Sequence, residues 1–325
     1  MEIKVLKTFE LTDKEWTQIV TGFNQSFDRN TTKERLVSLY KSNVSGYSYH
    51  AICYEHDTVI GFTSILPFQY LHKEQEFKAM LSCSSFVLKE YRSDAFLFKD
   101  MFEALKEECL KHGYSVFLGV PNKNSHKYSI VFLDSKDVGN LPYYALPSRL
   151  FAVLKKGRCK SVDTIIAFFI CLFCNINKIC SYALNFKEKL SEYSLVITDE
   201  FHKARFSAPY YSFSEKKNIK FWYRIVEEDN VKTAYLMDFR ENQVRTNKAL
   251  CTAAWHILRK EKIDIILYVG TLRMKQGLLL KVPSKFIPKP LPLTYNLLDI
   301  ENKQQFDSMS DLNLWDFGLM NFDGR

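Results

Sequence analysis

Two periods of hydrophobic and polar positions succeed one another along the chain, and they predict where helices and strands lie. Residues 12–42 carry apolar positions at helical spacing, which predicts two short helices, each with a threonine as its cap. Residues 49–70 instead form two runs rich in β-branched and aromatic side chains around a turn at residues 56–57, which predicts a hairpin. A third strand is predicted over residues 77–88, after the polar break HKEQE. The first part of the chain therefore predicts helices followed by strands.

The next segment, EYRSDAFLFKDMFEALKEECLKHG, combines a turn with an amphipathic helix. A helix is predicted over residues 95–112, with Gly113 in the position that favours a left-handed cap. Its apolar face consists of Phe98, Met101, Phe102, Leu105 and Cys109. The following run, YSVFLGV, is apolar without alternation and suits a strand buried on both faces. It ends at PNKNS, a turn that is expected to cap another helix ending near Leu133.

The second half of the chain repeats this plan. It predicts a hairpin over residues 221–239, a helix over 247–262 and a buried strand over 263–270. Because hairpin, helix and buried strand occur twice in the same order, duplication of one α/β unit is the economical interpretation.

Between the halves lies an apolar stretch, residues 162–184, whose uninterrupted part ends at Cys174. A helix that spans a membrane needs about 20 apolar residues, so this stretch is predicted to be too short. We expect a helix packed between two domains. The alternative is weak contact with a membrane surface through residues 155–184, aided by the basic cluster KKGRCK at residues 155–160.

Composition narrows the class of protein. The chain has 325 residues, enough for two average domains, and 15% of them are aromatic, so a sizeable core is expected. The net charge of +8 is moderate and spread along the chain, and no RNA-binding signature or basic DNA-reading helix is present, so we expect no nucleic-acid partner. The N-terminus lacks an apolar segment of signal-peptide length, which favours a cytoplasmic location.

The eight cysteines are scattered, and most lie in apolar runs, as free thiols do in a reducing compartment. Cys171 and Cys174 form a C-x-x-C, but no second pair of ligands follows at a zinc-site spacing. We therefore expect no metal site.

The order of elements and three short stretches resemble the GNAT family of acyl-CoA-dependent N-acyltransferases, over about residues 5–148. VIGFTSI resembles the third strand of that family, and VLKEYRSDAFLFKDMFEAL resembles its central motif, V-x-x-x-[YF]-[RQ]-x-x-G-x-[GA]. GVPNKNS resembles the strand end and the following asparagine found in many members. The second half resembles a more divergent copy. The whole chain is similar to tandem GNAT-like proteins among bacterial surface-polysaccharide genes, which are regarded as acylating amino sugars.

The resemblance implies a fold class and a division of the chain. It implies an α/β protein with two tandem GNAT-like domains, each a mixed, mostly antiparallel sheet flanked by helices. The implied domains are residues 1–150, which hold the candidate acyl-CoA site, and residues 191–325, with a helical linker over 151–190.

The resemblance also implies acetyl-CoA or another acyl-CoA as co-substrate. Backbone N–H groups at a helix N-terminus are suited to a pyrophosphate, and glycine lets the backbone come close. Here Arg92 stands at the [RQ] position, but Ala95 replaces the glycine, Leu97 stands at the [GA] position, and Asp94 adds a negative charge. Both a working turn and a structural relic remain open. The residues implied for the cofactor are Ser85, Phe86 and Val87 along the pantetheine arm, and Arg92, Ser93, Asp94, Ala95, Phe96 and Leu97 around the pyrophosphate.

Acyl transfer to an amine needs a desolvated amine, a donor to the carbonyl oxygen and an acid for the leaving thiolate. The resemblance points to Tyr128 as the acid, and Asn122 is suited to orient the acceptor. The alternatives are a core aromatic residue for Tyr128 and a helix cap for Asn122. His126 is a further candidate base, although a lone histidine in a turn is more often solvated.

The sequence thus favours an N-acyltransferase acting on a small amine, and the resemblance suggests an amino sugar on a nucleotide or lipid carrier in polysaccharide biosynthesis. The second half offers Arg240 and Arg245 but no glycine turn, so we expect it to form the acceptor wall of a cleft between the halves. A degenerate GNAT-like module that binds or scaffolds without chemistry is the main alternative. A Fem-like aminoacyl transferase using charged tRNA is disfavoured by the modest charge.

Overall fold

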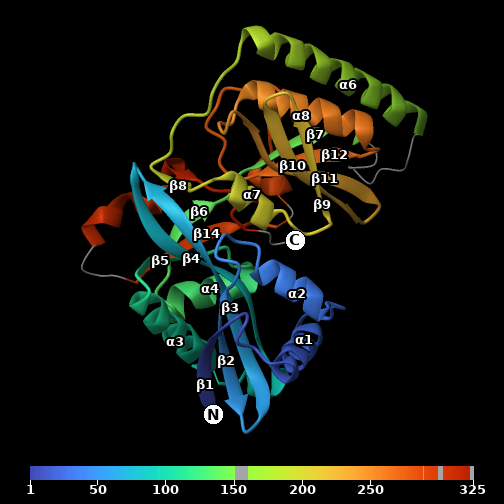
Figure 1. Cartoon of the computed structure of the whole chain (residues 1–325). Coiled ribbons are helices and arrows are strands. Elements are labelled where there is room, and N and C mark those ends of the chain that lie inside the picture. The colour runs from blue at the N-terminus through green and yellow to red at the C-terminus, as the bar shows by residue number, and fades with distance from the viewer. Residues whose placement is uncertain (95, 151–159, 288, 299–302, 323–325) are drawn as a thin grey trace.

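The computed structural model describes residues 1–94, 96–150, 160–287, 289–298 and 303–322. They form two α/β lobes, one from each half of the chain, with α6 on the outer side of the second lobe (Figure 1). The predicted α/β class is confirmed, because each lobe is built on a mixed, mostly antiparallel sheet flanked by helices.

The first sheet begins with four antiparallel strands and continues with a fifth that is parallel to the fourth. The strands are β1 (Glu2–Lys7), β2 (Tyr49–Glu55), β3 (Thr58–His72), β4 (Gln75–Val87) and β5 (Tyr114–Gly119). The predicted hairpin turns at His56, which takes the left-handed conformation with φ 52°. Side chains alternate between faces, so Ile52 and Tyr54 belong to the core under one set of helices and Ala51 and Cys53 to the core under the other.

Helices cover both faces of this sheet (Figure 1). They are α1 (Asp13–Phe27), α2 (Lys33–Tyr40), α3 (Leu97–Lys111) and α4 (Lys123–Phe132). The two predicted threonine caps are confirmed: Thr12 accepts from the N–H of Glu15 in a capping box, and Thr32 accepts from the N–H of Arg35. Gly113 follows α3 with φ 73°, as the sequence predicted.

The second sheet contains the predicted second hairpin and buried strand. Its strands from the second half are β9 (Tyr211–Lys216), β10 (Ile219–Glu228), β11 (Val231–Glu241), β12 (Ile265–Val269) and β13 (Leu280–Lys281). β10 and β11 turn at Asp229 and Asn230, both with positive φ, and the helix α8 (Asn247–Lys260) packs on them. The two short helices α7 (Asp199–Arg205) and η4 (Leu312–Leu314) and the longer η3 (Lys303–Ser310) complete this half.

Each half of the chain contributes a strand to the sheet of the other half. β7 (Tyr143–Pro147), from the first half, is antiparallel to β12 in the second sheet. β14 (Pro292–Leu297), from the second half, lies in the first sheet between β5 and β6 (Lys136–Asn140). The strands therefore do not divide between the sheets at the boundary that was expected near residue 150.

Further contacts join the halves. β8 (Tyr193–Leu195) pairs with the end of β3, and β15 (Trp315–Asp316) pairs with β8. One hydrophobic core runs through both lobes, with Leu66 and Tyr70 from the first sheet and Met237 and Val269 from the second. The fold is thus a single packed unit in which neither sheet is complete without the other half of the chain.

The helix α6 (Lys160–Ala183) differs from what the sequence predicted. It was expected to be packed between the domains, but it lies along α8 on the outer side of the second lobe, and eight of its large apolar side chains are exposed by more than 40% (Figure 1). The prediction ended the apolar run at Cys174, whereas the helix continues for about two and a half more turns, through Asn175, Asn177 and Lys178 to Ala183. By length and composition, Ser161–Ala183 is long and apolar enough to cross a membrane, which also corrects the judgement that it is too short.

Candidate active site

A gap opens in the first sheet where the two parallel strands separate. β4 and β5 pair as far as Leu81 and Leu118, after which β4 continues on its other edge with β3 as far as Val87. Residues 82–85 are partly exposed, unlike the buried residues that precede them. An open strand edge with unpaired N–H and C=O groups is suited to an extended ligand that carries amides.

Most of the predicted cofactor residues come together at this gap. The side chain of Ser85 forms a 2.7 Å hydrogen bond with the hydroxyl of Thr63, and Phe86 is buried against the helices on the opposite face. Arg92 follows η1 (Lys89–Tyr91) and turns back, so that its Nε donates to the carbonyl of Val87 at 2.8 Å. The strand end and the turn are therefore held side by side.

The turn itself contains its own anion. The carboxylate of Asp94 accepts a 2.9 Å hydrogen bond from the N–H of Phe96, one of the backbone donors that a bound phosphate would use. Ser93 is exposed, Phe96 is 60% exposed, and Leu97 is buried as the first residue of α3. Ala95 lies outside the described residues. Asp94 thus competes directly with a phosphate at the start of α3.

Tyr128 lies on α4 beside the start of α3. Its ring packs edge-on against Phe98 at 5.5 Å and stacks on Phe132 at 4.7 Å. Burial raises the pKa of Tyr128, and the backbone of Lys99 opposes that rise. The phenol therefore stays protonated near neutral pH, next to the first turn of α3.

Asn122 caps α4 in the way that the structural alternative predicted. Its Oδ1 accepts from the N–H groups of Asn124 at 2.9 Å and Ser125 at 3.0 Å. The nearby His126 has a different partner: its Nε2 lies 2.6 Å from a carboxylate oxygen of Asp137. The cap uses the amide oxygen of Asn122 and leaves its amide nitrogen available. His126 is paired with Asp137 instead.

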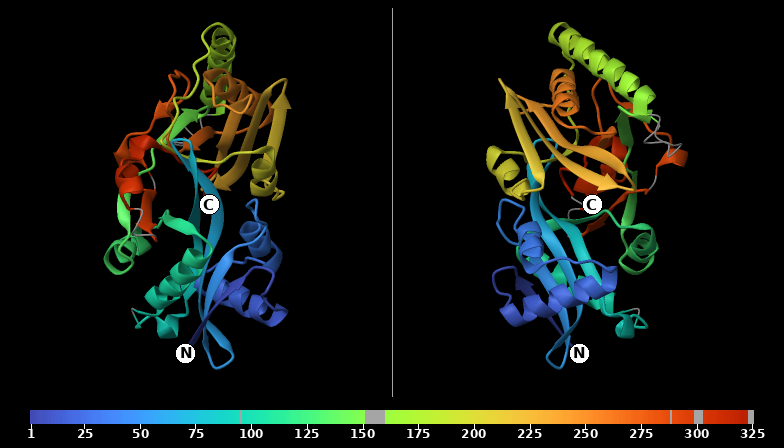
Figure 2. Two further views of the ribbon diagram at one scale, coloured as in Figure 1. Left: turned by 60° about the vertical axis from the view of Figure 1, so that its left-hand side comes forward. Right: turned by 90° about the vertical axis from the view of Figure 1, so that its right-hand side faces the viewer.

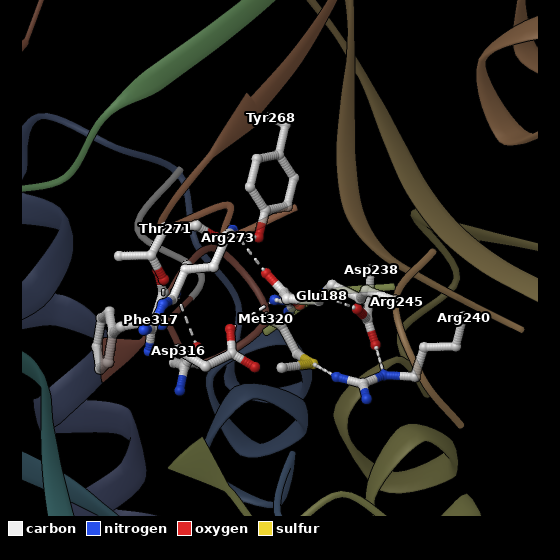
Figure 3. Close-up of polar contacts among 12 residues, drawn as sticks. Glu188, Asp238, Arg240, Arg245, Tyr268, Thr271, Arg273, Asp316, Phe317 and Met320 are labelled. Atoms are coloured by element: carbon white, nitrogen blue, oxygen red, sulfur yellow. Dashed lines mark hydrogen bonds and ion pairs between the residues drawn. The ribbon is translucent and has the colours of Figure 1, made fainter. Parts of the chain in front are cut away.

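The second sheet has a corresponding separation, but a buried ionic cluster fills it (Figure 3). β11 and β12 pair only as far as Tyr235 and Leu267. Beyond that point Asp238 accepts from Arg240 Nε at 2.7 Å and from Arg245 Nε at 2.9 Å. Arg240 and Arg245, which the sequence placed on an acceptor wall, are therefore turned inward and paired.

The cluster also joins three distant segments of the chain. Arg245 donates to Glu188 at 3.3 Å and to Asp316, and Glu188 accepts from the N–H of Arg273 at 3.1 Å. Asp316 can approach because Gly318 passes directly against Gly270 at the end of β12, where a side chain on Gly270 would collide with the backbone of residues 317–318.

The charges of this cluster are set by each other. Burial alone would raise the pKa of Asp238, but Arg240, Arg245 and His202 lower it well below its usual value. Burial raises the pKa of Glu188, although Arg245 opposes the change. The His202 ring stacks on Trp222 with centroids 3.9 Å apart and lies 2.8 Å from Asp238. The cluster is buried and its charged groups are paired with one another, which indicates a structural role.

A cavity of about 830 Å³ lies beside this cluster. Among the described residues, its lining includes no aspartate or glutamate and five cationic residues: Lys187, Lys189, Arg273, Lys275 and Lys281. Residues from both halves form it, since Asn140, Leu141 and Pro142 contribute as well. Among the described residues, Nη1 of Arg273 is buried and has no hydrogen-bond partner. The cavity is therefore suited to an anion.

The strand order relates this cavity to the gap in the first sheet. Gly119, at the end of β5, lies opposite Thr294 of β14, and two residues further along β14, Pro292 lies opposite Asn140. Neighbouring strands are about 4.8 Å apart, so Asn140 is on the order of 10 Å across the sheet from the end of β5, at the same edge. The gap and the basic cavity thus lie at the same end of the strands of this sheet.

Sequence reasoning missed the residues of this cavity and, apart from Arg240 and Arg245, those of the cluster. One signal was present in the stretch Lys187-Glu188-Lys189, where extended backbone sends alternate side chains to opposite sides. In the structure the two lysines line the cavity and Glu188 contacts Arg245. No group of three or more potential metal ligands occurs among the described residues, Cys171 and Cys174 included.

Comparisons with known proteins bear on the fold. No protein-family model and no curated protein sequence matches this chain. A GCN5-related N-acetyltransferase from Anabaena variabilis is similar in structure, with a TM-score of 0.56 and 10% identity over 92% of this chain and 74% of that protein. A probable N-acyltransferase of unknown function from Enterococcus faecalis gives a TM-score of 0.52 and 10% identity over 94% of this chain and 74% of that one.

A third similar structure is N-myristoyltransferase of Saccharomyces cerevisiae with bound myristoyl-CoA. Its TM-score is 0.53, with 11% identity over 90% of this chain and 82% of that protein. At such low identity these likenesses show the fold and not the activity. The chain has the fold of the GCN5-related N-acetyltransferases across both of its halves.

Proposed function

We propose that the protein is an N-acyltransferase that moves an acyl group from an acyl-CoA to an amine. The observation that carries the proposal is the separation of β4 and β5 beside the first turn of α3. The free edge of residues 82–85 suits the amides of a pantetheine arm, and the start of α3 suits a pyrophosphate. The fold shared with acetyl- and acyltransferases supports this assignment.

The proposed reaction needs few groups from the protein. The nitrogen of a neutral amine attacks the thioester carbonyl and the C–S bond breaks. The thiolate takes a proton, and the nitrogen gives up one of its own to solvent, which reprotonates the acid. Tyr128 supplies the proton to the thiolate, because burial keeps its phenol protonated and α4 holds it against the start of α3. The amide nitrogen of Asn122, which the cap leaves available, orients the acceptor. Acetyl-CoA is the donor suggested by the sequence resemblance.

The basic cavity supports an acceptor whose amine is carried on an anionic group. The described residues that line the cavity include five cations and no carboxylate, and this favours a phosphate or diphosphate as the bound group. An amino sugar on a phosphorylated carrier combines the amine and the anion, and a role in polysaccharide biosynthesis is the one that the resemblance suggests.

The test is calorimetric titration with acetyl-CoA and, separately, myristoyl-CoA. We expect micromolar binding of one of them. Asp94→Ala removes a negative charge and frees the N–H of Phe96, so it should tighten binding about fivefold, equivalent to ~1 kcal/mol. Asp57→Ala, which removes an exposed carboxylate from the β2–β3 turn of the same half, should leave the affinity unchanged.

Tyr128→Phe separates chemistry from binding. It should retain acyl-CoA affinity and lower the rate of amide formation at least about tenfold. If neither acyl-CoA binds to the folded protein or to Asp94→Ala, the enzyme assignment fails. A non-catalytic module, which the position of Asp94 in the turn favours, would then be the better interpretation.

A further inference from the structure

The helix α6 presents an apolar surface to the outside of the molecule. Its exposed face is a continuous helical stripe, because the side chains recur at intervals of three and four residues. The members that are exposed by more than 40% are Ile165, Phe168, Phe169, Leu172, Phe173, Ile176, Ile179 and Tyr182. In Figures 1 and 2 no other helix or strand covers this side of α6. A patch of this size on a protein surface marks an interaction site.

Three of the polar side chains of α6 face the protein, whereas Ser161 and Thr164 are exposed. Asp163 and Ser181 are buried, and Lys178 lies over the ring of Trp255 on α8, with its Nζ 3.6 Å from the ring centroid. The helix is therefore partly inverted relative to an ordinary surface helix, because most of its large apolar side chains are exposed while Asp163 and Ser181 are buried. Such an inversion is expected where the surroundings of the outer face are apolar.

Basic residues outnumber acidic ones in α6 and in the adjoining helix α8. α6 contains the basic residues Lys160 and Lys178, and α8 contains Lys248, Arg259 and Lys260. The acidic residue in these two helices is Asp163, which is buried. Together the two helices contain five basic residues and one acidic residue, which is buried. Lys178 lies over Trp255 and Lys248 pairs with Glu241, so the exposed cations Arg259 and Lys260, at one end of α8, are those that complement an anionic surface.

We propose that α6 attaches the protein to an anionic membrane surface, with the apolar stripe immersed in the interface and the helix axis parallel to the membrane plane. The 24 residues of α6 make a helix about 36 Å long, and the apolar stripe from Ile165 to Tyr182 covers about 27 Å of it. The helix does not cross the bilayer in this arrangement, because α8 lies along it and carries cations at both ends. Crossing would draw Lys248 and Arg259 into the hydrocarbon together with α6.

Self-association through α6 is the competing use of the same face. A second copy would add its own excess of basic residues in α6 and α8 to the same interface, and like charges repel. An anionic membrane removes this repulsion and solvates the apolar side chains at once. The charge pattern therefore favours lipid over a second copy of the chain.

The experiment is co-sedimentation of the full chain with vesicles of equal parts phosphatidylcholine and phosphatidylglycerol, and with phosphatidylcholine alone. The wild type should sediment with the mixed vesicles and much less with the neutral ones. The double variant Phe168→Asp, Phe169→Asp should bind the mixed vesicles at least about tenfold more weakly, since it removes two aromatic anchors. Both side chains are exposed, so the fold should be retained.

Phe9→Asp is the matched control. Phe9 is 65% exposed and Phe168 is 66% exposed, but Phe9 follows β1, a strand of the first lobe, whereas α6 lies on the outer side of the second lobe (Figure 1). This control should bind vesicles like the wild type, and thermal unfolding should show both variants folded. The proposal is overturned if the wild type ignores mixed vesicles, if the α6 variant binds as well as the wild type, or if it only converts a dimer to a monomer. The proposal is also overturned if the wild type binds neutral vesicles as strongly as mixed ones. It is overturned as well if the bound protein leaves the vesicles only in detergent, as a protein that spans the membrane does.

Discussion

Glu241 holds three segments of the second half together through four hydrogen bonds. Its carboxylate accepts from Asn185 at 2.8 Å, Thr246 at 3.0 Å, Asn218 at 3.2 Å and from Lys248. These donors come from the end of the α6 segment, the cap of α8, the β9–β10 turn and α8 itself. Burial opposes the charge, but the four donors lower the pKa of Glu241 to about 2.

This shift predicts a pH dependence of stability. The pKa of Glu241 is depressed in the folded state, so its contribution is present above the unfolded value of 4.5 and is lost as the pH falls from about 4.5 to about 2. The free energy of unfolding in urea should fall by roughly 2–3 kcal/mol more over this range for the wild type than for Glu241→Gln. Glu227→Gln, at an exposed position of the same sheet, should behave as the wild type does. Parallel pH profiles for all three proteins would contradict the assignment.

Single residues also show how far sequence reasoning reaches. The replaced glycine and the charge of Asp94 are visible in the sequence, and the turn does contain an internal anion. The partners of Arg245 are not visible, because Glu188 and Asp316 lie 57 and 71 residues away in sequence. No local pattern distinguishes an arginine that binds phosphate from one that is paired in a buried cluster.

Among the elements, the exchanged strands decide how the sheets are completed. β14 has a hydrogen-bonded neighbour on each side, β5 and β6, so its removal would leave both of those strands with an unpaired edge. β7 plays the matching part in the second sheet, between β12 and β13.

The exchange predicts that the first half does not fold alone. A fragment of residues 1–147 lacks β14 and exposes β7, so it should be aggregated or show no cooperative unfolding by circular dichroism. Joining residues 290–298 to the fragment through a flexible linker in place of β7 should restore a cooperative transition. A fragment without β14 that unfolds cooperatively would show that the strand is dispensable.

Local elements were predicted well, and their assembly was not. Both hairpins, the helices after them and the buried strands were predicted, since each depends on a short apolar period and a turn. β7 and β14 are both short and apolar, and nothing in YYALP or PLTYNL indicates which sheet each one joins. For α6 the composition suggested burial, but composition alone does not tell which side of a helix faces the protein.

The whole molecule is tied together across its lobes by Arg205, which is 2% exposed. Its Nε donates to the carbonyl of Met320 at 2.8 Å, and its Nη1 donates to the hydroxyl of Ser42 in the first half at 3.0 Å. Together with the shared hydrophobic core, this contact couples the stability of the two lobes.

We therefore predict that the protein unfolds in one calorimetric transition, with equal calorimetric and van't Hoff enthalpies. Arg205→Met removes both hydrogen bonds and should lower the free energy of unfolding by about 2–3 kcal/mol without splitting the transition. Arg35→Met, an exposed change on α2, should have little effect. Two transitions in the wild type would show that the lobes are independent.

The exchanged strands also govern the order of events during synthesis. The first sheet waits for β14, whose residues leave the ribosome about 150 residues after β6, which corresponds to roughly 8–30 s of translation. During that interval the facing edges of β5 and β6 have no partner. We therefore expect the nascent chain to need chaperones more than a protein whose domains fold one after another during translation. The first sheet is complete only once β14 has been synthesised.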